Sequence, residues 1–238
     1  MDLRVISFSS PEKNILFDQV LWQRAEEGLG GEVLRFWESE TPFIVLGKTS
    51  KADQEIVADH VERDHISIVR RTSAGGVVVQ GKGCLNFTLV LSKAKNPEMA
   101  SIASSYAFIL EKVILALKGL NIQARFYPPC DLALAENNRK FSGNAQRRGK
   151  NFILHHGTLL HHFDCALAKE YLTLPSKVPL YRANRSHQDF MANLNVDPKD
   201  IIKAFLQVFK IEKSNHHLEP QEFTYLDSLM KREQTFQQ

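Results

Sequence analysis

The sequence predicts an α+β fold, and three observations support that prediction. Short runs with the alternating pattern of β-strands recur through the first 92 residues. Residues 101–120 carry apolar side chains at helical spacing, and residues 131–160 read as three strands joined by short turns. No internal repeat and no shift in composition marks a linker, so we expect a single domain over residues 1–238.

The first 92 residues predict four strands, two helices and a hairpin. Pro11 suits the first position of a helix, and the apolar residues after it recur at helical spacing. Gly81 and Gly83 supply a turn between two runs of β-branched and aromatic residues. In chain order we predict strands at 3–8, 33–39, 43–48 and 66–71, helices at 11–28 and 51–65, and a hairpin at 77–92.

The remaining residues predict two helices and three more strands. In 101–120 an apolar residue recurs every three or four positions, and Gly119 ends the pattern. Asp197 suits the cap of a later helix that begins at Pro198. We predict helices at 101–120 and 197–210 and a meander of strands at 131–136, 139–148 and 152–160, with Asn137-Asn138 as its first turn.

Composition places the chain among globular proteins. Hydrophobic residues make up 43% and charged residues 24%, which argues against wholesale disorder. A net charge of +3 is too small to predict a nucleic-acid partner, although it suits an anionic cofactor or an acidic protein. The first residues lack the apolar core of a signal peptide, and no segment is long enough to span a membrane. We therefore expect a cytoplasmic protein without a membrane partner.

The three cysteines do not predict a disulfide framework or a zinc site. Cys84, Cys130 and Cys165 are odd in number and show no CxxC spacing. A nucleophilic cysteine needs a basic neighbourhood, whereas Cys130 stands beside Asp131, which would raise the pKa of its thiol. We expect reduced thiols with a packing role.

A glycine-rich turn follows the predicted strand at 66–71. In 69-VRRTSAGGVVV-79, Gly75 and Gly76 let the backbone approach a ligand closely, so that amides can donate to anionic oxygens. Arg70 or Arg71 can add positive charge. A tight turn with exposed arginines is the alternative. The spacing matches neither a Walker P-loop nor a dinucleotide fingerprint.

Two further motifs lie in the predicted meander. Lys140, in 139-RKFSGNAQRR-148, is either a solvated strand lysine or a cation placed to orient an acyl or phosphoryl oxygen. His155 and His156, in 155-HHGTLLHH-162, would point to opposite faces of a strand, so they cannot both ligate one metal without distortion. Packing, hydrogen bonding or substrate shaping suits them better.

Five motifs in a fixed order resemble the lipoate-protein ligase family. They are RRTSAGGV at 70–77, GCLNFT at 83–88, DL at 131–132, RKFSGNA at 139–145 and HHGTLL at 155–160. That family is similar to the octanoyltransferases and, more distantly, to the biotin protein ligases. The resemblance runs from about Val33 to Leu160, and 181–194 resembles the segment that follows this core in some members.

The resemblance implies a mixed, largely antiparallel β-sheet flanked by α-helices, of the biotin/lipoate protein ligase catalytic-domain type. An acyl-adenylate would lie between the glycine-rich loop and the strand of Lys140, the family's essential catalytic lysine. Asp131 would lie near the phosphate or Mg²⁺ and Asn86 near the nucleotide. The implied substrate-binding residues are Arg71, Ser73, Gly75, Gly76, Val77, Asn86, Asp131, Ser142, Gly143, His155, His156 and Gly157.

Three departures from the family pattern bear on the activity. Ser73-Ala74-Gly75-Gly76 replaces the usual Ser-Gly-Gly-Gly. Too few residues follow Leu194 to supply the C-terminal accessory domain of many bacterial ligases, so the closest resemblance is to lipoate-protein ligase A without that domain. Cys130 lies closer to Lys140 than the nucleophile of the transferase class that places its cysteine upstream.

The resemblance therefore implies a ligase that activates lipoate or octanoate as acyl-AMP with ATP and Mg²⁺, none of them tightly bound. The acceptor would be a lysine of a lipoyl domain, in a 2-oxoacid dehydrogenase or the glycine cleavage H protein. Two alternatives stay open: an ATP-independent octanoyl or lipoyl transferase that uses Cys130, and a non-catalytic module that binds an acyl group or a carrier domain. An acyl carrier protein or a separate accessory subunit would be a further partner.

Overall fold

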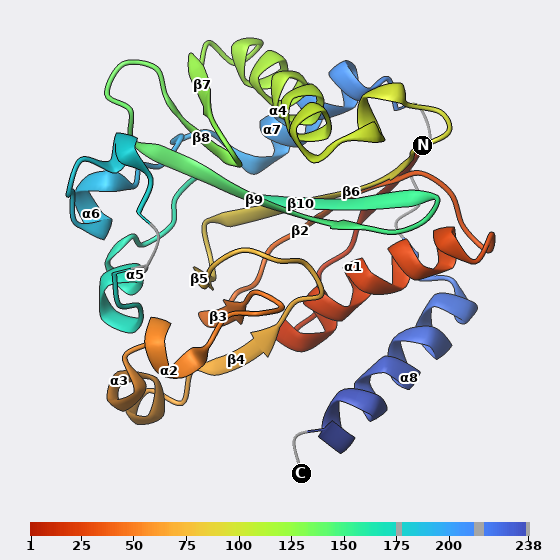
Figure 1. Ribbon diagram of the computed structural model, residues 1–238, viewed down its shortest axis with the longest axis horizontal. Helices are drawn as coiled ribbons and strands as arrows, with labels where there is room; N and C mark the ends of the chain where they lie inside the picture. Colours follow the sequence, from red (N-terminus) through yellow and green to blue (C-terminus); the bar gives the residue numbers. More distant parts are fainter. Residues whose placement is uncertain (175–177, 212–216, 237–238) are drawn as a thin grey trace.

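The computed structural model describes residues 1–174, 178–211 and 217–236, and a seven-stranded sheet forms its centre (Figure 1). The strand order is β1-β2-β6-β10-β9-β8-β7; β1 and β2 are parallel, and the other neighbours are antiparallel. A smaller sheet has the order β4-β3-β5, with β3 and β4 parallel. The prediction of a mixed, largely antiparallel sheet is confirmed.

The ten strands follow the predicted order along the chain, with one addition. The predicted meander is confirmed, because strand 140–148 pairs with both 131–134 and 152–160. The strand at 124–127, on the sheet edge, was not predicted. The bounds are β1 Asp2–Val5, β2 Val33–Trp37, β3 Phe43–Leu46, β4 Ser67–Arg70, β5 Val78–Gln80, β6 Cys84–Ser92, β7 Ala124–Tyr127, β8 Asp131–Leu134, β9 Lys140–Arg148 and β10 Phe152–Leu160.

Helices cover both faces of the large sheet. Helices α4 and α7 lie on one face, α1 lies on the other, and α8 packs beside α1 (Figure 1). Asp197 caps α7 by accepting from the amide of Lys199, as predicted. The bounds are α1 Pro11–Glu26, α2 Ala52–Glu55, α3 Ala58–Arg63, η1 Pro97–Ala100, α4 Ile102–Lys118, α5 Ala166–Tyr171, η2 Leu180–Arg182, α6 His187–Phe190, α7 Pro198–Phe209 and α8 Pro220–Phe236.

Apolar clusters on the two faces hold these layers together. Leu110, Val113 and Phe205, from α4 and α7, pack against the sheet on one side. Phe17 and Leu21 of α1 pack against the other side, where α8 joins the same cluster. Each fully buried side chain of this size contributes about 1.5–3 kcal/mol relative to exposure. None of the described helices combines the length and apolarity required of a transmembrane span.

Two local predictions were wrong. Residues 77–92 do not form a hairpin, because β5 pairs with β3 in the small sheet while β6 lies between β2 and β10 in the large one. The helix expected at 51–65 is divided into α2 and α3, because Ile56 forms a β-bridge with Leu172 between them. In both places a partner distant in sequence outweighs the local pattern.

Candidate active site

Lys140 lies beside Asp131 on neighbouring antiparallel strands. Its Nζ is 2.7 Å from Oδ1 of Asp131, and the two side chains are 28% and 10% exposed. An irregularity in the pairing of β8 with β9 shifts the register between Leu132 and Ala133. A Cβ added at Gly143 would lie 3.1 Å from Nζ of Lys140. The lysine therefore has a fixed partner and a small neighbour, and its ammonium group reaches solvent.

The segment after α5 contacts both members of this pair, the backbone of Lys140 and the carboxylate of Asp131. The backbone of Lys140 forms a parallel bridge with Met191, and its carbonyl accepts from the amide of Ala192 at 2.9 Å. Tyr181 donates its hydroxyl to Oδ2 of Asp131 at 2.8 Å and stacks on Tyr127 with 4.0 Å between ring centroids. Burial, and then the charge of Asp131, raise the pKa of Tyr181, so its hydroxyl stays protonated and donates. Nothing in the sequence marks Tyr181 as a site residue apart from its place in 181–194.

Arg71 shapes the glycine-rich loop from inside. The residue is 8% exposed, its Nε donates to Oγ of Ser73 at 3.0 Å, and its Nη2 donates to the carbonyls of Ala74 and Gly76 at 3.0 and 2.9 Å. Burial lowers the pKa of Arg71 to about 10, which leaves it charged at neutral pH. Gly75 has a φ of +106°, a backbone conformation that favours glycine.

A second glycine, which the sequence analysis did not single out, supports this loop. A Cβ at Gly47 would lie 1.9 Å from the carbonyl oxygen of Gly75, so only a glycine fits under the loop. Ser50 also donates to that oxygen at 3.0 Å. At the far end of the loop, the amide of Val77 donates to Oε2 of Glu55 at 3.3 Å. The only sequence signal for Gly47 was its place at the end of a predicted strand.

The loop lies against the lysine strand. A Cβ added at Gly75 would lie 4.0 Å from the Cβ of Ala145 in β9, and Oγ of Ser73 is 2.5 Å from Nε2 of His156 in β10. The structure thus brings the predicted loop residues, His156 and the Lys140–Asp131 pair to one side of strands β9 and β10.

Two predicted site residues, Asn86 and His155, have their contacts away from the Lys140–Asp131 pair and the loop. Asn86 is buried and donates to Oε1 of Gln80 and the carbonyl of Cys84, both at 3.1 Å. His155 is fully buried on the opposite face from His156 and stacks on Phe87. Burial lowers the pKa of His155 to about 3. Neither Asn86 nor His155 contacts Lys140, Asp131 or the loop in any hydrogen bond of the described residues.

Gly157 and Ser142 both lie against the side chain of Asn144. A Cβ at Gly157 would lie 1.9 Å from Oδ1 of Asn144, so the glycine makes room for that side chain. The Nδ2 of Asn144 donates to Oγ of Ser142 at 3.1 Å and to the carbonyl of Cys130 at 2.9 Å. Asn144 therefore ties β9 to the residue before Asp131. The sequence analysis missed Asn144, although it lies within the SGNA motif.

Cys130 lies at the site in a setting that keeps its thiol protonated. Its Sγ is 3.7 Å from Oδ1 of Asp131. Burial, and then the charge of Asp131, raise the pKa of Cys130, and the opposing effect of Lys140 does not offset them. Because the thiolate is the nucleophilic form of cysteine, this position weakens Cys130 as an attacking group.

The protein side chains near Lys140 do not make up a magnesium site by themselves. Both carboxylate oxygens of Asp131 already have partners, in Lys140 and Tyr181. Across the residues that the structure describes, no three His, Cys, Asp or Glu side chains gather as metal ligands would. A role of Asp131 toward Mg²⁺ stays a prediction.

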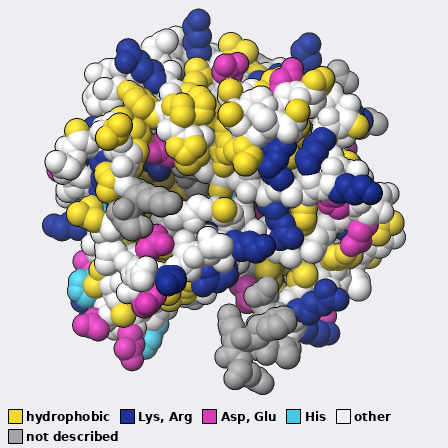
Figure 2. All heavy atoms as spheres, in the orientation of Figure 1, with side chains coloured by type: hydrophobic (Ala, Val, Ile, Leu, Met, Phe, Trp, Pro, Cys, Tyr) yellow, Lys and Arg dark blue, Asp and Glu magenta, His cyan; other side chains and the backbone are white. Residues whose placement is uncertain are grey.

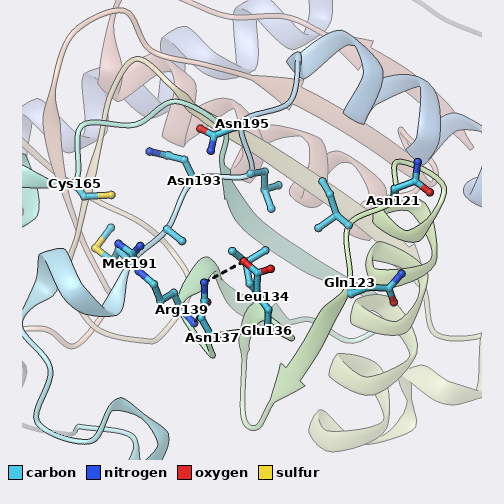
Figure 3. A pocket seen from close by; sticks show the side chains of 13 residues that line it. Asn121, Gln123, Leu134, Glu136, Asn137, Arg139, Cys165, Met191, Asn193 and Asn195 are labelled. Carbon is cyan, nitrogen blue, oxygen red and sulfur yellow. Dashed lines mark hydrogen bonds between the residues drawn. The ribbon is translucent and has the colours of Figure 1, made fainter.

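The structure also contains a cavity of about 630 Å³ (Figure 3). Arg139, Glu136 and Asn193 line it, but neither Lys140 nor Asp131 does. The cavity is therefore distinct from the candidate site.

Sequence comparison relates the chain to two kinds of enzyme. A sequence model of the lipoyl protein ligase A/B catalytic domain matches residues 10–210. A putative lipoate-protein ligase A of Schizosaccharomyces pombe is 28% identical over 179 residues, 74% of this chain and 47% of that protein. Octanoyltransferase LipM of Halalkalibacterium halodurans is 25% identical over 228 residues, 84% of this chain and 82% of that protein. The chain spans about half the length of the curated lipoate-protein ligases that it matches.

Solved structures share the fold. A bi-partite lipoate protein ligase of Thermoplasma acidophilum, described together with its E2 lipoyl domain, has a TM-score of 0.81 at 20% identity, covering 97% of this chain and 91% of that one. A lipoate-protein ligase A bound with ATP has a TM-score of 0.82 at 20% identity, covering 97% and 94%. The family match over residues 10–210 agrees with both structures, and the chain belongs to the lipoyl protein ligase A/B catalytic domain family.

Proposed function

We propose that this chain is a lipoate-protein ligase that activates lipoate or octanoate as acyl-AMP and transfers the acyl group to a lysine of a lipoyl domain. One observation carries the proposal: the ammonium group of Lys140 is fixed by Asp131 beside a glycine-rich loop that Arg71 holds in shape. The relatives named as lipoate-protein ligases, and the ATP-bound structure with the same fold, support it.

The glycine-rich loop would bind the phosphate of the acyl-adenylate. Arg71 occupies the carbonyls of Ala74 and Gly76, so the loop keeps its shape without a ligand. A preorganised set of backbone donors stabilises an anion without the cost of rearrangement during the reaction.

Lys140 would stabilise the negative charge that develops as the acyl group is transferred. Its ammonium group has three donors, and Asp131 takes one of them. The others can donate to the acyl carbonyl or to the oxygen that bridges acyl group and phosphate. Asp131 and Tyr181 would orient the lysine rather than react.

ATP and Mg²⁺ would enter together. Mg²⁺ usually keeps several waters and binds through one or two carboxylates and the phosphates of the nucleotide, which agrees with the absence of a metal-ligand cluster among the described residues. Asp131 is the carboxylate that we predict for this contact.

The acceptor would be a lipoyl domain of a 2-oxoacid dehydrogenase or the glycine cleavage H protein. The Thermoplasma acidophilum ligase is described with its E2 lipoyl domain, and Figure 2 shows Lys and Arg side chains over the middle of the face drawn, which suits an acidic partner. We propose that residues 1–238 act as one catalytic domain. A separate accessory subunit, as in a bi-partite ligase, is a further partner that this proposal allows.

Octanoyl transfer through Cys130 is the second candidate. Its support is the place of Cys130 next to the Lys140–Asp131 pair and the match to octanoyltransferase LipM over 82% of that protein. The raised pKa of the Cys130 thiol argues against it. A transferase of this kind would take its acyl group from an acyl carrier protein.

Pyrophosphate exchange tests the activation step. The purified chain is incubated with ATP, Mg²⁺ and labelled pyrophosphate, with and without lipoate or octanoate. We expect label to enter ATP only when the acid is present, because only an acyl-adenylate reverses in this way. The absence of acid-dependent exchange, together with an acyl-enzyme formed from octanoyl carrier protein, would favour the transferase. If neither reaction occurs, two descriptions stay open: a ligase that requires a separate accessory subunit, and a binding module without catalysis.

A further inference from the structure

A line of polar contacts joins helix α1 to the glycine-rich loop. Asp18 of α1 is 1% exposed, and its Oδ2 is 3.5 Å from Nδ1 of His156. The Nε2 of His156 is 2.5 Å from Oγ of Ser73, and Oγ also accepts from Nε of Arg71 at 3.0 Å. The contacts therefore run from α1 through β10 to the arginine that shapes the loop.

The groups behind Asp18 fix its charge. Its Oδ1 accepts from Nη1 of Arg35 at 2.6 Å, and its Oδ2 accepts from Oγ1 of Thr88 at 2.8 Å. Burial opposes ionisation of Asp18, but Arg35, His156 and Thr88 outweigh it and lower the pKa of the carboxyl. Asp18 is therefore a carboxylate that only accepts hydrogen bonds.

This charge sets the direction of the remaining hydrogen bonds. With Asp18 as acceptor, Nδ1 of His156 is the donor, and in the neutral tautomer that carries its proton on Nδ1 the Nε2 atom is an acceptor. The hydroxyl of Ser73 then donates to Nε2, and its oxygen accepts from Nε of Arg71. Each donor in the line has one acceptor, which defines a single rotamer for Ser73 and a single orientation for the Arg71 guanidinium.

We infer that Asp18, His156 and Ser73 are positioning residues that hold Arg71, and through it the glycine-rich loop, in the shape that receives the ligand. The same guanidinium donates to the carbonyls of Ala74 and Gly76, so its orientation sets the path of the loop. The inference deepens the proposed function, because it takes the acyl-adenylate as the ligand of that loop.

A nucleophilic role for this Ser-His-Asp arrangement fits the contacts less well. Ser73 is 1% exposed, and its oxygen already accepts from the guanidinium of Arg71, which lowers its ability to attack. The charge of Asp18 is already balanced by Arg35. These groups hold the loop in place rather than form a covalent bond with substrate.

Hydrogen exchange of the loop amides in the ligand-free protein tests the inference without any assumption about the reaction. We compare the wild-type chain with Ser73→Ala, His156→Leu and His156→Gln, and follow a peptide that covers residues 72–77. Loss of one net hydrogen bond predicts roughly 10-fold faster exchange for Ser73→Ala and His156→Leu. The amide of His156→Gln can accept from Ser73 and donate to Asp18, so it should restore most of the protection.

His161→Leu is the control matched to His156→Leu. His161 is also buried, and its Nε2 is 2.9 Å from Oε2 of Glu38, so this change removes a comparable contact elsewhere. It should leave exchange at 72–77 unchanged. Wild-type exchange in both Ser73→Ala and His156→Leu would overturn the inference, as would equal acceleration in His161→Leu.

Binding and mass measurements complete the test. We expect Ser73→Ala to weaken the affinity for a non-hydrolysable acyl-adenylate analogue roughly 10-fold, the effect of about one hydrogen bond, while its melting temperature stays near that of the wild type. A covalent acyl group on Ser73, seen by intact mass after incubation with acyl donors, would contradict the positioning role. Because the exchange data need no substrate, they remain interpretable if the chain proves to catalyse a different acyl transfer.

Discussion

The side chain of Lys140 is held by Asp131 and its backbone by Met191 and Ala192. This double attachment limits how far its ammonium group can move. In the proposed mechanism a neutral or differently shaped side chain would not substitute for it, because the donors must occupy the same place as the reaction proceeds. The first prediction follows from this geometry.

Lys140→Ala should lose about 100- to 1000-fold in the rate of acyl transfer, the effect of losing one preorganised donor. Lys140→Arg should recover little, because a planar guanidinium presents its donors in other positions. Lys150→Ala, in the exposed turn between β9 and β10, is the matched control and should keep wild-type activity. The measurement is single-turnover transfer, with a thermal melt for each variant. A folded Lys140→Ala that keeps near wild-type rates would remove the lysine from the mechanism.

Cys130→Ser should keep most of the activity. Burial and Asp131 raise the pKa of the thiol, so the wild-type cysteine is protonated and no acyl-cysteine is needed. Cys165→Ser, at the start of α5, serves as the control for loss of a partly buried thiol. Steady-state transfer with ATP and lipoate provides the measurement. The transferase mechanism takes over if Cys130→Ser folds but is inactive while Lys140→Ala remains active.

At the residue scale, the sequence pointed to the proposed site residues better than to the residues that hold them in place. Lys140, Asp131 and the glycine loop lie in short motifs whose order carried the resemblance. Asp18 lies within an amphipathic helix and Tyr181 in an irregular segment, where local spacing gives no sign of a distant partner. Their roles depend on contacts between residues 50 to 138 positions apart, which only the fold reveals.

At the element scale, the two adjacent glycines of the glycine-rich loop, Gly75 and Gly76, differ in backbone conformation and in the space around them. Gly75 has a φ of +106°, and a Cβ there would lie 2.7 Å from Nη2 of Arg71. Gly76 has an ordinary backbone conformation, and its Cβ would meet only Oε2 of Glu55, at 3.5 Å. Gly75 is therefore required by the loop itself, whereas Gly76 matters only if a ligand approaches.

Gly75→Ala should destabilise the chain by about 1–3 kcal/mol, because alanine rarely adopts a positive φ. Gly76→Ala should leave the free energy of unfolding unchanged but weaken binding of an acyl-adenylate analogue, because its Cβ blocks close approach of the backbone. Denaturant unfolding and calorimetric binding of both variants separate the two effects. Wild-type affinity in Gly76→Ala would place the ligand away from this loop.

At the element scale, length and periodicity predicted long elements well. The helix at 102–118 and the strands at 131–160 were predicted correctly, because each carries its own sustained periodicity of apolar residues. The supposed hairpin at 77–92 failed because both of its strands read as β, yet their partners lie elsewhere: Val79 pairs with Ile44, and Phe87 pairs with Gly157. Strand pairing depends on such distant partners.

At the scale of the whole molecule, buried polar groups connect stability to pH. His155 is fully buried, and burial lowers its pKa from 6.5 to about 3. In the unfolded chain the imidazole takes up a proton near its ordinary pKa, whereas in the folded chain it stays neutral. The unfolded state therefore binds more protons between pH 6.5 and about 3, and stability falls as the pH falls through that range.

His155→Gln should flatten this dependence. Glutamine does not titrate and can still form hydrogen bonds with Gln146 and Asn144, the present partners of His155. Denaturant unfolding of both proteins between pH 7 and pH 4 measures the difference. The titration of all other groups contributes equally to the two free energies of unfolding and cancels in the comparison. Parallel curves for the two proteins would show that His155 is not the group responsible.

The central claim is that Lys140 and the glycine-rich loop carry out ATP-dependent acylation of a lipoyl domain. Intact-mass analysis of an apo lipoyl domain tests it most directly. One sample contains the chain with ATP, Mg²⁺ and lipoate, a second contains it with octanoyl carrier protein and no ATP, and a third repeats the first with Lys140→Ala. The account predicts acylation in the first sample and little in the other two within the same time. Acylation of the domain only in the second sample would contradict it.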